Sequence, residues 1–132
     1  MNDCVFCNLD ESRIEIENDL ALSFKDLYPV TNGHTLVIPK RKVQSFFDLT
    51  EEETAAMFEL LHLQKEDLKN KDSSITGFNI GINDGEDAGQ TIMHCHIHLI
   101  PRRSGDMEDP RGGVRGVTVS YTHLTLPTKS GV

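Results

Sequence analysis

The chain has 132 residues, which is enough for one domain with its own hydrophobic core but not for two domains of ordinary size. Its hydrophobic share of 37% and charged share of 26% are those of a globular soluble protein, and no apolar run approaches the length of a membrane span. A formal net charge of -8 argues against broad binding to nucleic acids or anionic membranes, although a local site for a phosphate-bearing ligand is compatible with it.

Cys4 and Cys7 form a C-x2-C pair near the start of the chain. This spacing suits two thiolates on one tetrahedral metal ion, a redox dithiol, or two small buried residues in a turn. The choice depends on whether the chain supplies further ligands. Because three cysteines are an odd number and no signal-like leader precedes Cys4, we expect a reducing, cytoplasmic location.

The first forty residues predict three strands joined by turns. Apolar residues, alternating or continuous and bounded by Asn, Asp and Gly, mark the strands Ile14 to Ile16, Ala21 to Lys25 and His34 to Pro39. Asn18-Asp19 supplies the turn of a hairpin between the first two strands, and the third strand ends at a proline. His34 therefore begins a mostly buried strand, where its imidazole has a partner unless it lies at the surface of the preceding turn.

One long helix is predicted from about Glu51 to Asn70, after a short helical turn over residues 45–49. Thr50 and Glu53 form a capping box, in which each side chain accepts a hydrogen bond from the other residue's backbone amide. Apolar residues recur along the helix at Met57, Leu60, Leu61 and Leu68. Packing against a core or a partner helix explains this stripe without any catalytic role.

The second half of the chain predicts two more strands around a glycine-bearing loop. Residues 78–82 alternate as a fourth strand, and residues 94–101 alternate as a fifth strand that ends at a proline. The two glycines of the loop, residues 83–91, let the backbone approach a ligand closely and let N–H groups form an anion-binding nest. A plain hairpin loop is the simpler interpretation from composition alone.

His94, His96 and His98 occupy alternate positions of the fifth strand, so their side chains should share one face. The residues between them, Cys95, Ile97 and Leu99, should point into the core. Packing does not explain three imidazoles in register, because imidazole suits neither a dry core nor an idle surface. We therefore interpret this face as a functional site.

Imidazoles in this arrangement support two kinds of chemistry. One histidine can attack phosphorus if one ring nitrogen is held protonated and the other presents its lone pair, while a second histidine donates to the phosphate or the leaving group. Alternatively, an H-x-H pair and a third histidine can bind zinc in a hydrolytic site. The periodicity of the strand does not decide between them.

The run His94-Cys95-His96-Ile97-His98-Leu99-Ile100 resembles the His-φ-His-φ-His-φ-φ signature of the histidine triad (HIT) family of nucleotide hydrolases and transferases, where φ is apolar. Gly33–Pro39, Asn83–Gly85 and Ala88–Thr91 fall where that family has its other motifs. The details are closest to the bacterial hydrolases and to the fragile histidine triad branch, which cleaves dinucleoside polyphosphates. The resemblance implies an α+β fold, an antiparallel five-stranded meander sheet with one long and one short helix, paired into a two-fold dimer.

The resemblance also implies residue roles. His96 would attack the α-phosphorus, and His98 would hydrogen-bond the phosphate and the leaving oxygen. His94 would shape the site through its backbone carbonyl or bind a metal, and His34 would support the three from the neighbouring strand. Asp26 would hold the ribose hydroxyls. The remaining implied contacts are Phe24 and Leu27 at the base, and Asn83, Gly89, Gln90 and Thr91 at the phosphates.

The activity implied by the resemblance is hydrolysis of a phosphoanhydride, such as that of diadenosine tetraphosphate, at the α-phosphate. A covalent nucleotidyl-histidine would be the intermediate, and a nucleoside monophosphate would be released. Two alternatives stay open, a purine nucleoside phosphoramidase and a nucleotide-binding regulator without turnover. The expected partner is an adenine nucleotide, with no nucleic acid and no membrane.

The predicted metal site is incomplete. Family members with the C-x2-C pair commonly place a histidine soon after the third strand as a further zinc ligand, and this chain has Lys42 there. Cys4, Cys7 and His94 could supply three ligands, whereas a structural zinc site is normally closed by four. We therefore expect no required cofactor, and zinc that is absent or weakly held.

The end of the chain departs from the family pattern. We expect the domain to span residues 1–117, with an extended arm over residues 106–117. Residues 118–132 match nothing in the family and are interpreted as a foreign extension, so Tyr121 and His123 are given no role.

Overall fold

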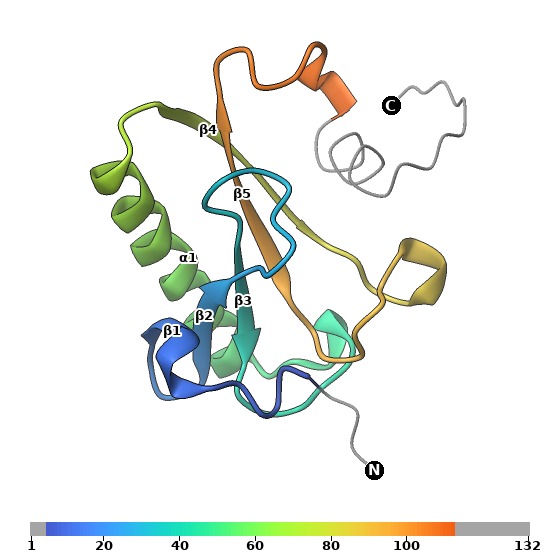
Figure 1. Ribbon diagram of the computed structural model, residues 1–132. Coiled ribbons are helices and arrows are strands. Elements are labelled where there is room, and N and C mark those ends of the chain that lie inside the picture. The colour runs from blue at the N-terminus through green and yellow to red at the C-terminus, as the bar shows by residue number, and fades with distance from the viewer. Residues whose placement is uncertain (1–4, 113–132) are drawn as a thin grey trace.

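A five-stranded antiparallel sheet, with one long helix across one face, forms the body of the molecule (Figure 1). The computed structural model describes residues 5–112. Its strands are β1 (Ile14–Glu17), β2 (Ala21–Lys25), β3 (Thr35–Pro39), β4 (Ile75–Ile82) and β5 (Ile97–Arg103). Its helices are α1 (Glu51–Lys71) and the short 3-10 turns η1 (Glu11–Arg13), η2 (Phe46–Asp48), η3 (Glu86–Ala88) and η4 (Pro110–Gly112). Cys4, the end of the expected arm and the tail over residues 118–132 lie outside the described residues.

The strand order is β1-β2-β3-β5-β4, so the sheet has the expected five antiparallel strands but is not a simple meander. The meander prediction is wrong at one point because α1 connects β3 to β4, and so long a connection frees these strands from pairing with each other. β4 takes the outer edge and β5 returns between β4 and β3. His98 thereby lies opposite Leu36 on β3 and Gly81 on β4, inside the sheet.

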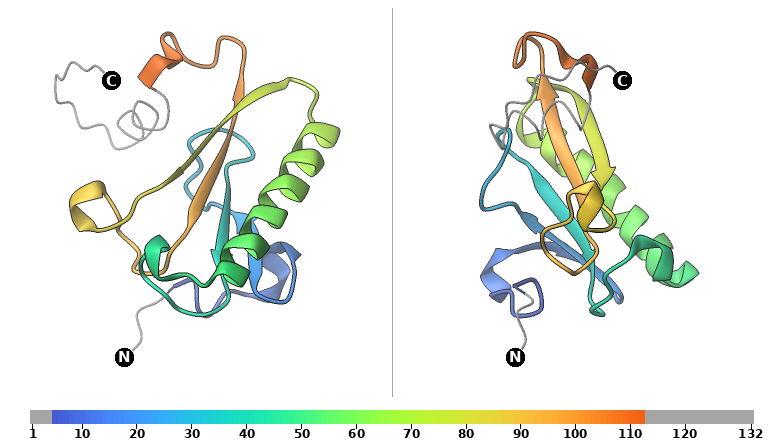
Figure 2. Two further views of the ribbon diagram at one scale, coloured as in Figure 1. Left: turned by 180° about the vertical axis from the view of Figure 1, so that it is seen from behind. Right: turned by 90° about the vertical axis from the view of Figure 1, so that its right-hand side faces the viewer.

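The predicted capping box is present at the start of α1. The Thr50 hydroxyl accepts from the Glu53 amide at 3.0 Å, and the Glu53 carboxylate accepts from the Thr50 amide at 2.9 Å. The view from behind in Figure 2 shows α1 lying across the sheet. Met57 and Leu60 are fully buried there, against Cys95 and the sheet residues Ala21, Val37 and Ile97. None of the described helices is both long and apolar enough to cross a membrane.

Local side-chain bonds account for the other predicted turns. The Asn18 side-chain oxygen accepts two backbone amides, at 3.2 and 2.9 Å, and closes the hairpin of β1 and β2. Ser45 is the N-cap of η2, the short helical turn expected before α1. The Asp84 carboxylate accepts from the Phe46 amide at 2.7 Å, which ties η2 to the loop that precedes β5.

Strand β5 begins at Ile97, three residues after the predicted start at His94. The strand is shorter because the Cys95 amide donates to the Val43 carbonyl at 2.7 Å rather than to a strand of the sheet. The predicted alternation nevertheless holds, since Cys95, Ile97 and Leu99 are all buried in clusters on the α1 side. His96 and His98 therefore lie on the opposite face.

Candidate active site

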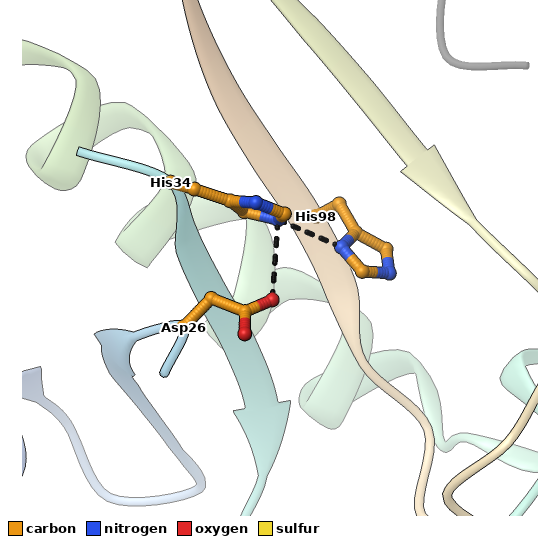
Figure 3. Close-up of side chains that lie close together, drawn as sticks. All are labelled: Asp26, His34 and His98. Atoms are coloured by element: carbon orange, nitrogen blue, oxygen red, sulfur yellow. Dashed lines mark hydrogen bonds and ion pairs between the residues drawn. The ribbon is translucent and has the colours of Figure 1, made fainter. Parts of the chain in front are cut away.

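The histidines gather on the face of the sheet that α1 does not cover. Figure 3 shows His34, which directly precedes β3, beside His98 of β5, with Asp26, which directly follows β2, next to them. The ring of His96 lies 5.1 Å from the ring of His98, centroid to centroid. His34 and His96 are almost entirely buried. The fold thus brings together side chains from three strands around one small volume.

The protonation of His96 follows from its hydrogen bond. Nδ1 of His96 lies 2.8 Å from the backbone carbonyl oxygen of His94. A carbonyl can only accept, so Nδ1 carries the hydrogen and, in the neutral ring, Nε2 carries the lone pair. This is the arrangement that a histidine nucleophile requires.

The protonation of His98 is set through His34. The Val30 amide donates to Nδ1 of His34 at 3.0 Å, so the hydrogen of the neutral His34 ring is on Nε2. Nε2 of His34 lies 2.9 Å from Nδ1 of His98, which therefore accepts (Figure 3). The hydrogen of His98 is then on Nε2. His98 presents an N–H donor on the face where His96 presents a lone pair.

Burial lowers the pKa of each histidine of this cluster. Desolvation is the largest cause for His34, His94 and His96. At His98, desolvation followed by the repulsion from His96 and His34 lowers the pKa to about 3. The carbonyl of His94 opposes the shift at His96, because it stabilises the protonated ring. The rings are consequently neutral at pH 7, as the tautomers above require.

Asp26, His34 and His98 are close enough to share a cation, since one ligand atom of each lies within 4.8 Å of the others. The tautomers argue against this. A metal ion on Nε2 of His34 would have to displace its proton while Nδ1 still accepts from Val30, which leaves an imidazolate. The Asp26 carboxylate, 3.5 Å from His34 Nε2, is instead placed to share that proton.

Two of the predicted metal ligands are adjacent. The Cys7 sulfur lies 3.6 Å from Nδ1 of His94, and Nε2 of His94 lies 2.8 Å from the Pro39 carbonyl oxygen. Nε2 therefore carries the hydrogen, and the lone pair of His94 faces the sulfur. The positive charge of Lys42 is near enough to contribute to the lowered pKa of His94. An ammonium group in that place repels a cation, so the donor set fits zinc poorly.

The two residues predicted to contact the nucleobase differ in exposure. Phe24 is buried and Leu27 is exposed. The ring of Phe6 covers Phe24, with centroids 5.2 Å apart, and it also meets the His96 ring edge-on at 5.2 Å. Phe6 is not among the site residues predicted from the sequence. Its position inside the C-x2-C pair is the one feature that singles it out.

The residues predicted to contact the phosphates lie in the loop before β5. The side chain of Gln90 stabilises this loop. Its side-chain oxygen accepts from the Gly85 amide at 2.8 Å, and its nitrogen donates to two backbone carbonyls at 3.0 and 3.1 Å. Gly89 has a positive φ of 96°, and a Cβ there would approach the Asn83 side chain to 3.4 Å. Asn83 is half-buried and Thr91 is exposed, so these two can face a ligand.

Comparisons with known proteins agree with this geometry. The model of the HIT domain family matches residues 9–105. The chain is 41% identical over 102 residues to the nitrilase and fragile histidine triad fusion protein NitFhit of Caenorhabditis elegans, which covers 77% of this chain and 23% of that protein. It is 39% identical over 98 residues to the asymmetrical bis(5'-nucleosyl)-tetraphosphatase of Schizosaccharomyces pombe, which covers 74% of this chain and 53% of that enzyme.

The chain therefore spans about a quarter and about half of the length of these two relatives. Among solved structures, a HIT family protein from Bacillus anthracis superposes with a TM-score of 0.73 at 31% identity. That match covers 92% of this chain and 94% of the other, so it extends over nearly all of both folds.

Proposed function

Because this chain belongs to the HIT domain family, we propose that it is a nucleotide hydrolase that cleaves a dinucleoside polyphosphate at the α-phosphate. The tetraphosphatase of Schizosaccharomyces pombe supports this class of substrate. The observation that carries the proposal is the complementary protonation of two neighbouring rings. His96 presents a lone pair on Nε2, and His98 presents an N–H on Nε2.

In the first step, the lone pair of His96 Nε2 forms a bond to the α-phosphorus. The bond from phosphorus to the bridging oxygen breaks, and its electron pair leaves with that oxygen. The N–H of His98 donates a hydrogen bond to the departing oxygen and stabilises its charge. Nδ1 of His96 keeps its proton, and the His94 carbonyl stabilises the positive charge that the nucleotidylated ring acquires.

In the second step, water attacks the phosphorus and the P–N bond breaks, with its electron pair returning to His96 Nε2. The surplus proton of the water passes to solvent, and the nucleoside monophosphate leaves. Both histidines finish in the tautomers in which they began. The intermediate splits one difficult displacement into two easier ones.

The protonation of His98 favours a phosphoanhydride over a phosphoramidate. A neutral His98 whose Nδ1 already accepts from His34 can share its Nε2 proton but cannot give it up without becoming an imidazolate. A departing phosphate needs no proton, because its last pKa is about 6. A departing amine does need one. The site is therefore better suited to expel a nucleotide than an amine.

The substrate contacts follow the layout of the strands. Asp26 lies at the end of β2 with one carboxylate oxygen accepting from the Tyr28 amide, and it can accept the ribose hydroxyls. Adenine is the favoured base, and the base is proposed to contact Phe6, which packs on the buried Phe24, and the exposed side chain of Leu27. Asn83 and Thr91 can donate to phosphate oxygens.

The protein is proposed to act as a homodimer. β4 is the outer strand of the sheet, so one of its edges has no pairing partner among the described strands. Next to it, an apolar groove between α1 and β4 is lined by Phe58, Leu61, His62, Lys65, Phe78, Ile80 and Leu99. A second copy would cover both the groove and the open edge.

Activity is proposed to require no metal, since attack by His96 uses only its own lone pair. Zinc is proposed to be absent or weakly held near Cys7 and His94, because Lys42 offers an ammonium where a fourth ligand is needed. A cytoplasmic location remains part of the proposal.

The test offers the purified protein diadenosine tetraphosphate and adenosine phosphoramidate separately and identifies the products by mass spectrometry. We expect a higher kcat/KM for the dinucleotide and, after rapid quenching, a nucleotidyl adduct on His96. His96→Asn should abolish turnover and retain AMP binding. His123→Asn, in the tail that is given no role, is the matched control and should keep turnover within about twofold of the unsubstituted protein.

Two results would contradict the proposal. Substantial steady-state activity in His96→Asn would exclude the covalent mechanism. Faster turnover of the phosphoramidate than of the dinucleotide would show that the leaving group is an amine.

A further inference from the structure

The order of the strands assigns the two halves of the substrate to different parts of the sheet. This inference rests on the proposed function. β2 and β3, with Asp26 and Phe24, lie on one side of β5, and β4 lies on the other. In Figure 3 the His98 ring lies between Asp26 and β4. If the nucleoside lies over β2 and β3 and is attacked at its α-phosphate, the leaving half extends over β4.

β4 presents Gly81 and Asn79 on the face of the sheet that carries His98. Gly81 is opposite His98 and Asn79 is opposite Ile100, and directly opposed residues of paired strands share a face. Gly81 has no side chain, so it leaves room beside His98 for a departing group. Asn79 is the next residue along β4 on the same face. Diagonal neighbours of this kind lie about 7–8 Å apart, which a chain of two phosphates can span.

The orientation of the Asn79 amide is fixed by Arg102. Nη1 of Arg102 donates to the Asn79 side chain at 2.7 Å. A guanidinium group can only donate, so the atom that faces it is the amide oxygen. The amide nitrogen of Asn79 therefore points away from Arg102, and it has no hydrogen-bond partner within residues 5–112.

The remaining donors of the Arg102 guanidinium are paired with a carboxylate. Its Nε and Nη2 donate to the two carboxylate oxygens of Asp106, at 2.9 and 2.7 Å, in a bidentate pair. The Asp106 charge balances that of Arg102, so the guanidinium orients Asn79 rather than attracting phosphate. What remains at this point of the histidine-bearing face is a positioned N–H donor that has no partner among residues 5–112.

We propose that Asn79 recognises the leaving group, by donating from its side-chain nitrogen to a non-bridging oxygen of the departing nucleotide. Phosphate oxygens accept such a bond, whereas an amine or a phenol leaving group has no oxygen at that distance from the α-phosphorus. Asn79 is then a residue that determines specificity for polyphosphate leaving groups, and Arg102 is the residue that positions it.

The test compares two substrates that share the adenylyl group. Diadenosine tetraphosphate expels a nucleotide, and the phenyl ester of AMP expels a phenolate that carries no phosphate and no further oxygen acceptor. Asn79→Asp has the same shape and can still accept from Arg102, but it replaces the donor with a negative charge. We expect kcat/KM for the dinucleotide to fall about tenfold or more, as for the loss of one hydrogen bond to a charged group. The kcat/KM for the ester should not change, so the ratio of kcat/KM for the dinucleotide to that for the ester should fall by the same factor. Equal losses for both substrates, or no loss, would overturn the assignment.

A binding measurement separates this inference from the proposed function. When Asn79→Asp is added to the His96→Asn protein, the affinity for diadenosine tetraphosphate should fall about tenfold, whereas the affinity for AMP should not change. Normal AMP binding with an unchanged affinity for the dinucleotide would overturn the role of Asn79 alone. Failure of His96→Asn protein to bind either nucleotide would overturn the proposed function and this inference together.

Discussion

At the scale of single residues, backbone groups decide what each ring of the site can do. The His94 carbonyl holds a proton on His96, and the Val30 amide, through His34, determines which nitrogen of His98 is protonated. Neither backbone group changes its own charge with pH. The site is therefore preorganised by groups that cannot be removed by a side-chain substitution.

Asp26→Ala should weaken nucleotide binding, because the ribose hydroxyls lose a charged acceptor. The loss of a hydrogen bond to a charged group costs about 1.5–3 kcal/mol, or roughly tenfold or more in Kd. Titration calorimetry with AMP measures it. The control is 2',3'-dideoxy-AMP, which should bind both proteins equally, and an unchanged Kd for AMP would show that Asp26 does not contact the ribose.

Lys42→His should raise zinc affinity, since it replaces an ammonium with a neutral ligand close to His94 and Cys7. Metal analysis of both proteins after dialysis against equal free zinc gives the comparison. Lys40→His, two residues earlier on the exposed side, is the matched control and should not bind more zinc. Stoichiometric, chelator-resistant zinc in the protein with Lys42 would contradict the proposed weak site.

At the scale of the elements, α1 stabilises the strands that carry the site by burying its apolar side chains against them. Leu60→Ala should therefore lower the free energy of unfolding by about 2–5 kcal/mol, because Leu60 is fully buried against the sheet. Urea denaturation measures this. Leu63→Ala, at an exposed position of the same helix, should cost far less, and equal losses would mean that α1 packs differently.

At the scale of the whole molecule, the buried neutral histidines couple stability to pH. Each has a lowered pKa in the fold, to about 3 at His98, whereas the unfolded ring titrates near 6.5. Between these values the unfolded chain binds more protons, so stability is complete above pH 6.5 and falls as the pH decreases below it.

Urea unfolding at pH 7.5, 6.5 and 5.5 should show this decrease before most carboxylates titrate, roughly below pH 5. His98→Asn should reduce the slope of the free energy of unfolding against pH, because it removes one histidine whose pKa is lower in the fold than in the unfolded chain. The idea fails if stability is constant over this range, or if the slope is the same in both proteins.

The dimer is also a property of the whole molecule. Ile80, on the outer strand, and Phe58, on α1, are both large, apolar and about half exposed in a single copy. Ile80→Arg should therefore convert a dimer to a monomer in sedimentation equilibrium at micromolar concentration. Phe47→Arg is the control, because Phe47 is more exposed but lies outside the groove. A monomeric unsubstituted protein would contradict the proposal.

The amino-acid sequence determined those features that depend on near neighbours in the chain. The capping box of α1 and the Asn18 turn involve residues at most three apart, so their side-chain chemistry was sufficient to predict them. The alternation of histidines with Cys95, Ile97 and Leu99 likewise assigned the two faces of β5, because a side-chain period of two does not depend on which strands pair.

The tertiary structure decided what depends on distant segments. The place of β5 between β3 and β4 follows from the path of α1, and the start of β5 at Ile97 follows from a hydrogen bond to Val43. Phe6 reaches His96 only after folding. The tautomer of His98 depends on His34, which is 64 positions away, because a ring nitrogen is protonated according to the group it faces and only the fold brings that group near.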